Sequence, residues 1–297
     1  MILALFLELP GTVLSMSVAG LALLAIGLWA AKNDIVQARG IDKIVALTYL
    51  CFGTPLAVFG SEHLSREKFL LNMVPSYMPL RSFWLYFVGI ALIAAGLSIV
   101  TKIKVQWSGL LVGIMMFLFV AMLYLPGAIR IGGRMAWTIV FRETSFGSAG
   151  WVLAGFAMGG NSRPGKILIN VGRVLIGLTA IFFGIQHFLH PLVLPVVPLQ
   201  RQMPTWVPSR PVTDYMTGAF LVVAGGCFLL SRKTRMAAAY LGAWILLLLE
   251  VIYAPVLIAS LADPGTQAKV EGISYFADTL LFCGVILSVA RATARQR

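Results

Sequence analysis

The chain has 297 residues, of which 59% are hydrophobic and 11% charged, and its mean hydropathy is +0.91. This composition excludes a soluble domain, and several uncharged stretches of about 20 residues are long enough to cross ~30 Å of hydrocarbon. The net charge is +12, and the basic residues lie in short connections between apolar runs. We therefore expect them to set the orientation of the chain in the membrane and to contact anionic lipids, not nucleic acid.

Nine apolar segments are predicted to be transmembrane helices, which makes the chain an all-α polytopic membrane protein. No basic residue precedes the first segment, which is also longer than the apolar part of a usual signal peptide, so we expect a retained helix. The predicted spans are about 12–31, 43–61, 83–101, 107–125, 144–160, 167–189, 212–231, 237–258 and 273–290.

The connections between these segments alternate between the two sides of the membrane. Most of the 23 basic residues fall in short connections on the side of the C-terminus, such as SRKTR at 231–235. The positive-inside rule therefore predicts a cytoplasmic C-terminus and an N-terminus outside, in a bacterial inner (cytoplasmic) membrane. The longer connections then lie on the outer face, where we expect any function carried by loops.

The second half of the chain repeats a pattern of the first half, with matching residues a constant number of positions apart. We call this number, the separation of Pro75 from Pro204, the repeat offset. Upstream the separation is slightly smaller, where FGSEH at 59–63 matches FGIQH at 183–187, so the second copy has five extra residues between its histidine and its prolines. The pairs at the repeat offset are Pro75 and Pro204, Tyr77 and Trp206, Pro79 and Pro208, Arg81 and Arg210, Tyr86 and Tyr215, Gly89 and Gly218, Gly96 and Gly225, Gly113 and Gly242, Tyr124 and Tyr253, and Pro126 and Pro255.

This repetition predicts two four-helix bundles preceded by one extra helix. Four is an even number, so the two bundles have the same orientation and form parallel repeats about an axis along the membrane normal. We expect the recurring glycines to let helix backbones approach closely. The predicted regions are 1–40 (N-terminal helix and loop), 41–160 (first unit), 161–166 (linker) and 167–297 (second unit with a basic C-terminal tail).

Two segments rich in proline, VPSYMPLR at 74–81 and MPTWVPSR at 203–210, precede corresponding helices. They contain too much proline to span, and Tyr and Trp suit the head-group region, so we predict short lids at the outer interface. The residues of these interfacial lids are Pro75, Tyr77 and Pro79 in the first unit and Pro204, Trp206 and Pro208 in the second.

The repeated pattern is F-G-x-x-H at the end of a helix, a proline/aromatic/proline/arginine segment, and a helix with Y-x-x-G and a later glycine. It resembles the DoxX/DoxD family of small bacterial and archaeal membrane proteins, over residues 45–160 and again over 167–290. The resemblance implies one four-helix unit per copy and a role beside an archaeal terminal oxidase linked to thiosulfate:quinone oxidoreduction. The leading helix and the duplication depart from that family.

His63 and His187 occupy the same position in the two units. Two interpretations remain open: a group that transfers protons or hydrogen-bonds a quinone carbonyl, and an interfacial side chain that anchors the lid to a loop carbonyl. His190 follows His187 by three residues, but Pro191 is expected to end the helix there, so we predict neither a metal site nor a haem site.

Glu250 is the most isolated acid, with seven uncharged residues on either side, and Asp278 enters the last span from the outer side. Both align with alanines of the first unit, so the second unit is predicted to hold the pocket. The candidate pocket residues are His187, Glu250, Tyr253, Asp278 and Arg210, with His63, Arg81 and Tyr124 as their repeat equivalents. The alternative is a structural hydrogen-bonded network.

Arg81 and Arg210 precede corresponding helices, where they either hold an anionic substrate or bond loop carbonyls and lipid phosphates. The cysteines at positions 51, 227 and 283 lie singly in apolar runs and are expected to be buried. No soluble-enzyme motif is present, so an autonomous enzyme is not predicted.

Three functions follow from these observations. The first is a component of a redox or respiratory membrane complex with a quinone or a lipid in the second unit. The second is a non-catalytic scaffold or accessory subunit that contacts other subunits and membrane lipids. The third is a small-molecule transporter, suggested by the internal repeat.

Overall fold

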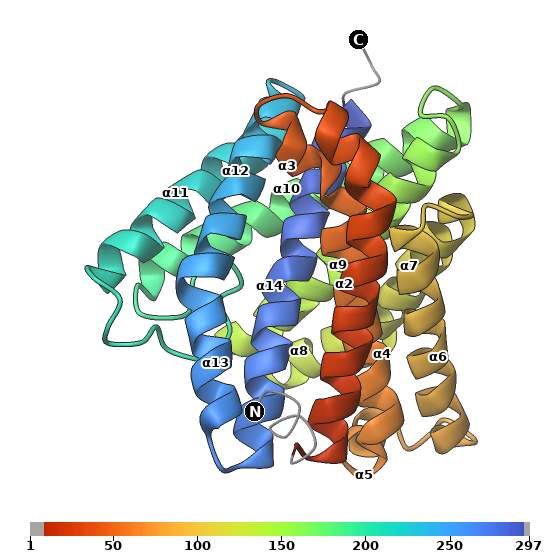
Figure 1. Ribbon diagram of the computed structural model, residues 1–297, viewed down its shortest axis with the longest axis vertical. Helices are drawn as coiled ribbons and strands as arrows, with labels where there is room; N and C mark the ends of the chain where they lie inside the picture. The colour runs from red at the N-terminus through yellow and green to blue at the C-terminus, as the bar shows by residue number, and fades with distance from the viewer. Residues whose placement is uncertain (1–8, 294–297) are drawn as a thin grey trace.

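The structure, a computed structural model, describes residues 9–293, without the side chain of Glu67. Within these residues every regular element is a helix, and the long helices stand side by side with the start of α2 and the end of α14 at opposite ends (Figure 1). The long helices are α2 (Gly11–Gln37), α4 (Thr48–Ser65), α6 (Arg81–Val100), α7 (Val105–Phe119), α9 (Arg134–Ala157), α10 (Arg163–Leu189), α11 (Arg210–Leu229), α12 (Thr234–Leu248) and α14 (Thr266–Thr293). The shorter elements are α3 (Asp42–Ala46), α5 (Glu67–Leu70), the 3₁₀ helix η1 (Leu71–Met73), the π-helices η2 (Val120–Tyr124) and η3 (Leu249–Tyr253), α8 (Leu125–Ile131) and α13 (Ala254–Ala262).

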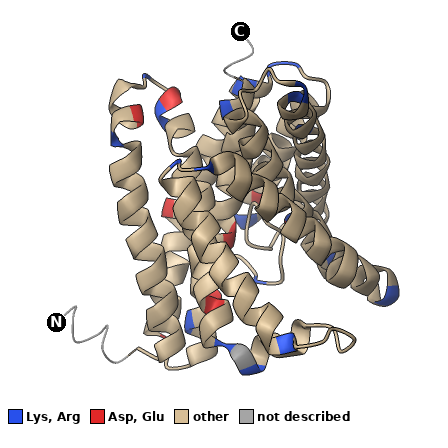
Figure 2. Cartoon of the chain, turned by 90° about the vertical axis from the view of Figure 1, so that its right-hand side faces the viewer, with Lys and Arg blue, Asp and Glu red and all other residues tan. Residues whose placement is uncertain are grey.

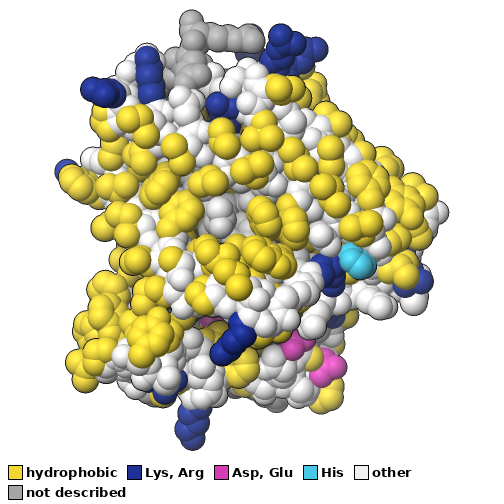
Figure 3. Space-filling view, turned by 180° about the vertical axis from the view of Figure 1, so that it is seen from behind, with side chains coloured by type: hydrophobic (Ala, Val, Ile, Leu, Met, Phe, Trp, Pro, Cys, Tyr) yellow, Lys and Arg dark blue, Asp and Glu magenta, His cyan; other side chains and the backbone are white. Residues whose placement is uncertain are grey.

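Seven helical segments among the described residues are long and apolar enough to cross a membrane, so the chain has the architecture of a multi-pass helical membrane protein. Lys and Arg gather mostly at the two ends of the molecule, whereas hydrophobic side chains cover the middle of its face (Figures 2 and 3). The seven segments are residues 11–37, 81–100, 105–131, 163–189, 210–229, 234–262 and 266–293.

The two predicted spans outside these seven, 43–61 and 144–160, need corrected boundaries. Residues 42–46 form the separate helix α3, and α4 begins only at Thr48. α9 begins at Arg134, directly after two glycines with positive φ that end α8, and so extends well upstream of the predicted start. The pair Arg142–Glu143 therefore lies inside a helix and not in a loop.

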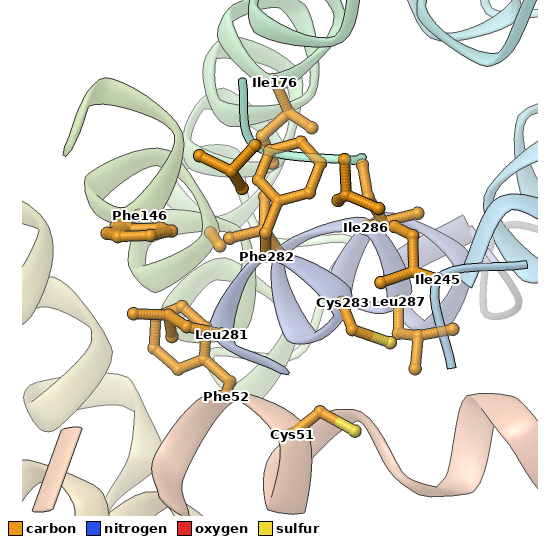
Figure 4. Packing of buried hydrophobic residues seen from close by; sticks show 14 of the residues in the cluster. Cys51, Phe52, Phe146, Ile176, Ile245, Leu281, Phe282, Cys283, Ile286 and Leu287 are labelled. Carbon is orange, nitrogen blue, oxygen red and sulfur yellow. The ribbon is translucent and has the colours of Figure 1, made fainter. Parts of the chain in front are cut away.

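The core lies where α14 passes between α4 and α9 (Figure 4). Phe282 and Cys283 are fully buried there, and Gly284 packs so closely on α4 that an added Cβ would lie 2.5 Å from the Phe52 backbone nitrogen. Cys51 is also buried, so the expected burial is confirmed for these two cysteines, whereas Cys227 is only half-buried. α14 thus joins segments from the beginning and the middle of the chain.

Two helix pairs meet through the same glycine contacts. α4 contacts α6 where Gly60 faces Gly89, and α10 contacts α11 where Gly184 faces Gly218. A Cβ on Gly60 would lie 2.6 Å from the Gly89 oxygen, and one on Gly184 would lie 2.7 Å from the Gly218 oxygen. The close approach expected from the repeated glycines is confirmed, and any larger side chain would push these helices apart.

Several other local features recur at the repeat offset. The bounds of α6 and α11 differ by this offset, and so do those of α7 and α12 and those of the two π-helices. Each π-helix precedes a proline, Pro126 or Pro255, which cannot donate a backbone hydrogen bond and crowds the preceding turn. The wider π turn accommodates the proline without ending the helix.

Candidate functional site

A cavity of about 1120 Å³ lies in the first half of the chain, among α4, α6, α7, η2, α9 and α14. We call it the first-half cavity. Its lining is mainly aliphatic and aromatic, and it includes exposed residues of α6 and α7 such as Phe87, Leu111 and Ile114. Because these exposed residues belong to both helices, the cavity reaches the surface at α6 and α7, on the side that would face lipid.

Three charged side chains form the polar end of this cavity. The Arg142 guanidinium donates to Asp278 Oδ2 at 2.7 Å and to Glu143 Oε1 at 2.7 Å. Only 8% of the side chain is exposed for each acid and 18% for the arginine. α9 supplies Arg142 and Glu143 while α14 supplies Asp278, so this charged triad bridges the two halves. Tyr124 of η2 lines the same cavity.

A chain of hydrogen bonds crosses one end of the cavity, from the end of α4 to the start of α14. Arg66 donates to Glu62 Oε1 at 2.8 Å and to Gln267 Oε1 at 2.8 Å. The Gln267 amide in turn donates to Glu271 Oε1 at 2.8 Å. All four residues line the cavity, and we call them the polar bridge. His63 lies beside the bridge and donates from Nδ1 to the Phe59 carbonyl oxygen at 2.8 Å.

The predicted grouping of pocket residues in the second half is wrong. The structure places Asp278 in the first-half cavity, and Glu250 is exposed on the outside of the molecule. Tyr253 is buried, although it follows Glu250 by only three residues. Both lie in a π-helix, whose turn holds more residues than that of an α-helix, so side chains three apart do not share a face.

His187 is fully buried beside Asp214, with 3.0 Å between Nδ1 and Oδ1. That distance suits an ion pair, yet none of the four side-chain nitrogen and oxygen atoms of the two residues makes a hydrogen bond of good geometry. His190 is exposed at the end of α10, so it does not join His187 in a common site. The buried partner Asp214 was not predicted from the sequence.

Arg210 and Arg81 hold the connections that precede their helices. Arg210 donates to the Met203 carbonyl at 3.3 Å, and Arg81 donates to the Val74 carbonyl at 3.1 Å and to the Leu71 carbonyl. The two acceptors at positions 74 and 203 are also separated by the repeat offset. The interpretation that these arginines bond loop carbonyls is confirmed.

The connection between α10 and α11 folds into the second half, and we call residues 190–209 the plug. Tyr253 donates to the plug at the Pro195 carbonyl at 2.5 Å, and Arg134 donates to the Leu199 carbonyl at 3.2 Å. Leu199 also lines the first-half cavity, so the plug forms part of its wall. The buried plug residues are Val193, Leu194, Val196, Val197, Leu199, Met203 and Val207.

The two proline-rich segments were predicted to form an equivalent pair of lids, but the stretches of chain around them differ in burial. Tyr77 and Trp206 are largely exposed, 67% and 52%, as side chains at a head-group interface would be. Pro75 and its neighbour Val74 line the first-half cavity, whereas the second segment continues from a deeply buried stretch. The five extra residues of the second copy were visible in the sequence, but the burial of the segment was not inferred from them.

The charged triad was also missed, although its signal is present. The sequence FRETS at 141–145 sets an arginine and a glutamate between apolar runs, but the predicted span began after them. With α9 extended to Arg134, both charges lie within a long helix and are largely buried, and buried ionisable residues often mark functional positions. Comparisons of the chain with protein-family models, curated proteins and solved structures give no match.

Proposed function

We propose that this membrane protein binds a lipid-soluble amphiphile in the first-half cavity. The observation that carries the proposal is one cavity with an aliphatic and aromatic body and a buried, charged end. The opening at α6 and α7 would let the molecule enter from the bilayer. Because lipid tails are as apolar as the cavity walls, the tail contributes little selectivity, and the polar end must supply most of it.

The resemblance to the DoxX/DoxD family suggests the setting of this function. It suggests a role beside a redox complex. A quinone and a membrane lipid both have a fitting shape for the cavity, and the charge at its polar end bears on the choice between them. We further propose that the two halves are copies of one four-helix unit, with nine membrane crossings and a cytoplasmic C-terminus. The recurring glycine contacts, π-helices and arginine bonds support the duplication.

A single substitution can test whether the cavity is used. Trp244 occupies the position in the second half that Met115 occupies in the first, because the repeat offset separates the two. Met115 lines the cavity, so Met115→Trp should fill part of it. The protein would be extracted into lipid nanodiscs, and the retained lipophile identified by solvent extraction and mass spectrometry.

We expect the wild-type protein to retain one lipophile and Met115→Trp to lose most of it. The matched control is Trp244→Met, which changes the corresponding position of the other half and should leave the lipophile content unchanged. Equal contents in the wild type and Met115→Trp, with both proteins folded, would contradict the proposal.

A role as an accessory subunit is a second candidate, favoured by Glu250. This acid is exposed within a candidate membrane span, beside the exposed Leu247 and Val251, and among the described residues it has no hydrogen bond or ion pair. A carboxylate facing hydrocarbon is costly, and a partner helix with a basic or hydroxyl side chain would remove that cost.

Site-specific photo-crosslinking in native membranes tests this second candidate. A photoreactive residue at Val251 should give a discrete protein adduct that one at Ala121 does not, because Ala121, the equivalent of Glu250, is the exposed position of this face in the first half. The absence of an adduct at both positions would count against a partner on this face.

A further inference from the structure

We infer that the amphiphile bound in the first-half cavity carries a positively charged head group. This inference rests on the proposed function and names the chemical class of its ligand. It follows from the balance of charge at the polar end of the cavity, where buried carboxylates outnumber the guanidinium groups that could neutralise them.

The charged triad carries a formal excess of one negative charge. Arg142 is the only basic partner that the described residues offer to both Glu143 and Asp278. It donates from Nε and Nη2 to Glu143 and from Nη1 to Asp278. A single guanidinium can balance only one of the two carboxylates. In a site of low dielectric the second must either take up a proton or receive a cation from elsewhere.

The polar bridge does not supply that cation. Arg66 already pairs with Glu62 at 2.8 Å, while Glu271 accepts a hydrogen bond from the neutral amide of Gln267. Lys104 lines the cavity, but it lies at the other end of α7, roughly 30 Å along the helix axis from Tyr124. With His63 counted as neutral, the end of the cavity lined by the bridge and the triad therefore keeps a formal acidic excess.

Aromatic rings near the triad favour the same ligand class. Phe146 lies 5.9 Å below the Arg142 guanidinium, measured to the ring centroid, and Tyr124 and Tyr275 line the same end of the cavity. Ring faces attract cations, most strongly where water is excluded. An anionic head group would meet carboxylates there, and a neutral one would require the second carboxyl group to take up a proton.

The experiment compares two probes that share a tail and differ in the charge of the head: dodecylamine, which is cationic at neutral pH, and dodecanol. Binding of each radiolabelled probe to the full-length protein in nanodiscs is measured after subtraction of empty nanodiscs. We expect dodecylamine to bind more tightly than dodecanol. Asp278→Asn should weaken dodecylamine binding about tenfold or more, the size of one lost contact to a charged group, and leave dodecanol binding unchanged.

Controls separate folding from charge and separate the two proposals. Glu143→Gln removes one negative charge of the same triad from a different helix, so it should weaken dodecylamine binding as Asp278→Asn does. If one of the two variants does not fold, the other still tests the inference. Glu250→Gln removes an acid outside the cavity and should change neither probe. If dodecanol binds the wild type as tightly as dodecylamine, or a retained neutral quinone is identified, the inference fails while the proposed function stands. If neither probe binds above empty nanodiscs, the proposed function itself fails.

Discussion

The two halves of the chain pair their helices alike but fill the space between the helices differently. In the second half Phe220 of α11 packs against Trp244 of α12 with 5.2 Å between ring centroids, so two aromatic rings fill the space between these helices. The first half has Ala91 and Met115 at those positions, and both line the cavity. The smaller pair leaves the space between α6 and α7 open to the surroundings.

The plug adds a second difference between the halves. Tyr253 in the second half donates to the plug at Pro195, whereas its equivalent Tyr124 faces the first-half cavity. The shorter connection of the first half has no counterpart to the buried stretch of the plug. The comparison teaches that glycine-mediated helix pairing can stay constant while a few side chains and one loop decide whether the interior is open or filled.

The largest effect is expected at the buried pair of the second half. His187→Leu would leave Asp214, which is fully buried, without its partner. Breaking a buried pair from one side destabilises a protein by about 3–5 kcal/mol, so we expect a loss of this order in the free energy of unfolding. Denaturant unfolding followed by tryptophan fluorescence measures it.

The matched variant is Asp214→Leu, because Leu85 occupies the equivalent position in the first half. The His187 ring could then donate to the Phe183 carbonyl, as His63 donates to the Phe59 carbonyl. We expect this variant to be destabilised far less than His187→Leu, because the apolar replacement leaves no unpaired buried charge. Equal losses in the two variants would show that the halves differ here by more than one side chain.

An intermediate effect is expected at the two equivalent tyrosines. Tyr253→Phe removes the hydrogen bond to the plug, and the Pro195 carbonyl keeps only the bond from the Val197 N–H, so we expect a loss of about 0.5–1.5 kcal/mol in the free energy of unfolding. Tyr124→Phe should leave the free energy of unfolding nearly unchanged and reduce the amount of retained lipophile. The same two measurements, unfolding and mass spectrometry, are made on both variants. A plug that does not stabilise the second half would make the two unfolding results alike.

The sequence predicted the helical membrane class and the positions of most long helices, because length and hydropathy determine both. The glycine contacts were also predictable, since Gly89 and Gly218 keep their places in the repeat. These features depend on local composition and on register within one chain. None of them requires knowledge of which helices meet across the two halves.

The charged triad of the first-half cavity could not be predicted from local composition and register. Asp278 was identified as an important acid, but its partner Arg142 comes from α9, far earlier in the chain. The pairing depends on α14 passing beside α9, which hydropathy does not specify. The side from which Glu250 projects depends on the π-helix η3, and a pattern based on the α-helical period assigns it wrongly.

The smallest effect is expected for Glu250→Gln. Its side chain lies outside the cavity and has no partner among residues 9–293, so the retained lipophile should be unchanged and the free energy of unfolding should shift by no more than about 0.5 kcal/mol. Ala121, its equivalent in the first half, is exposed in the same way, which indicates that this face of the helix points outward in both halves. Loss of the lipophile in Glu250→Gln, with Asp278→Asn unaffected, would return the binding site to the second half. A lost photo-crosslinked adduct at Val251 with an unchanged lipophile content would instead assign Glu250 to a subunit contact, separate from the cavity of the first half.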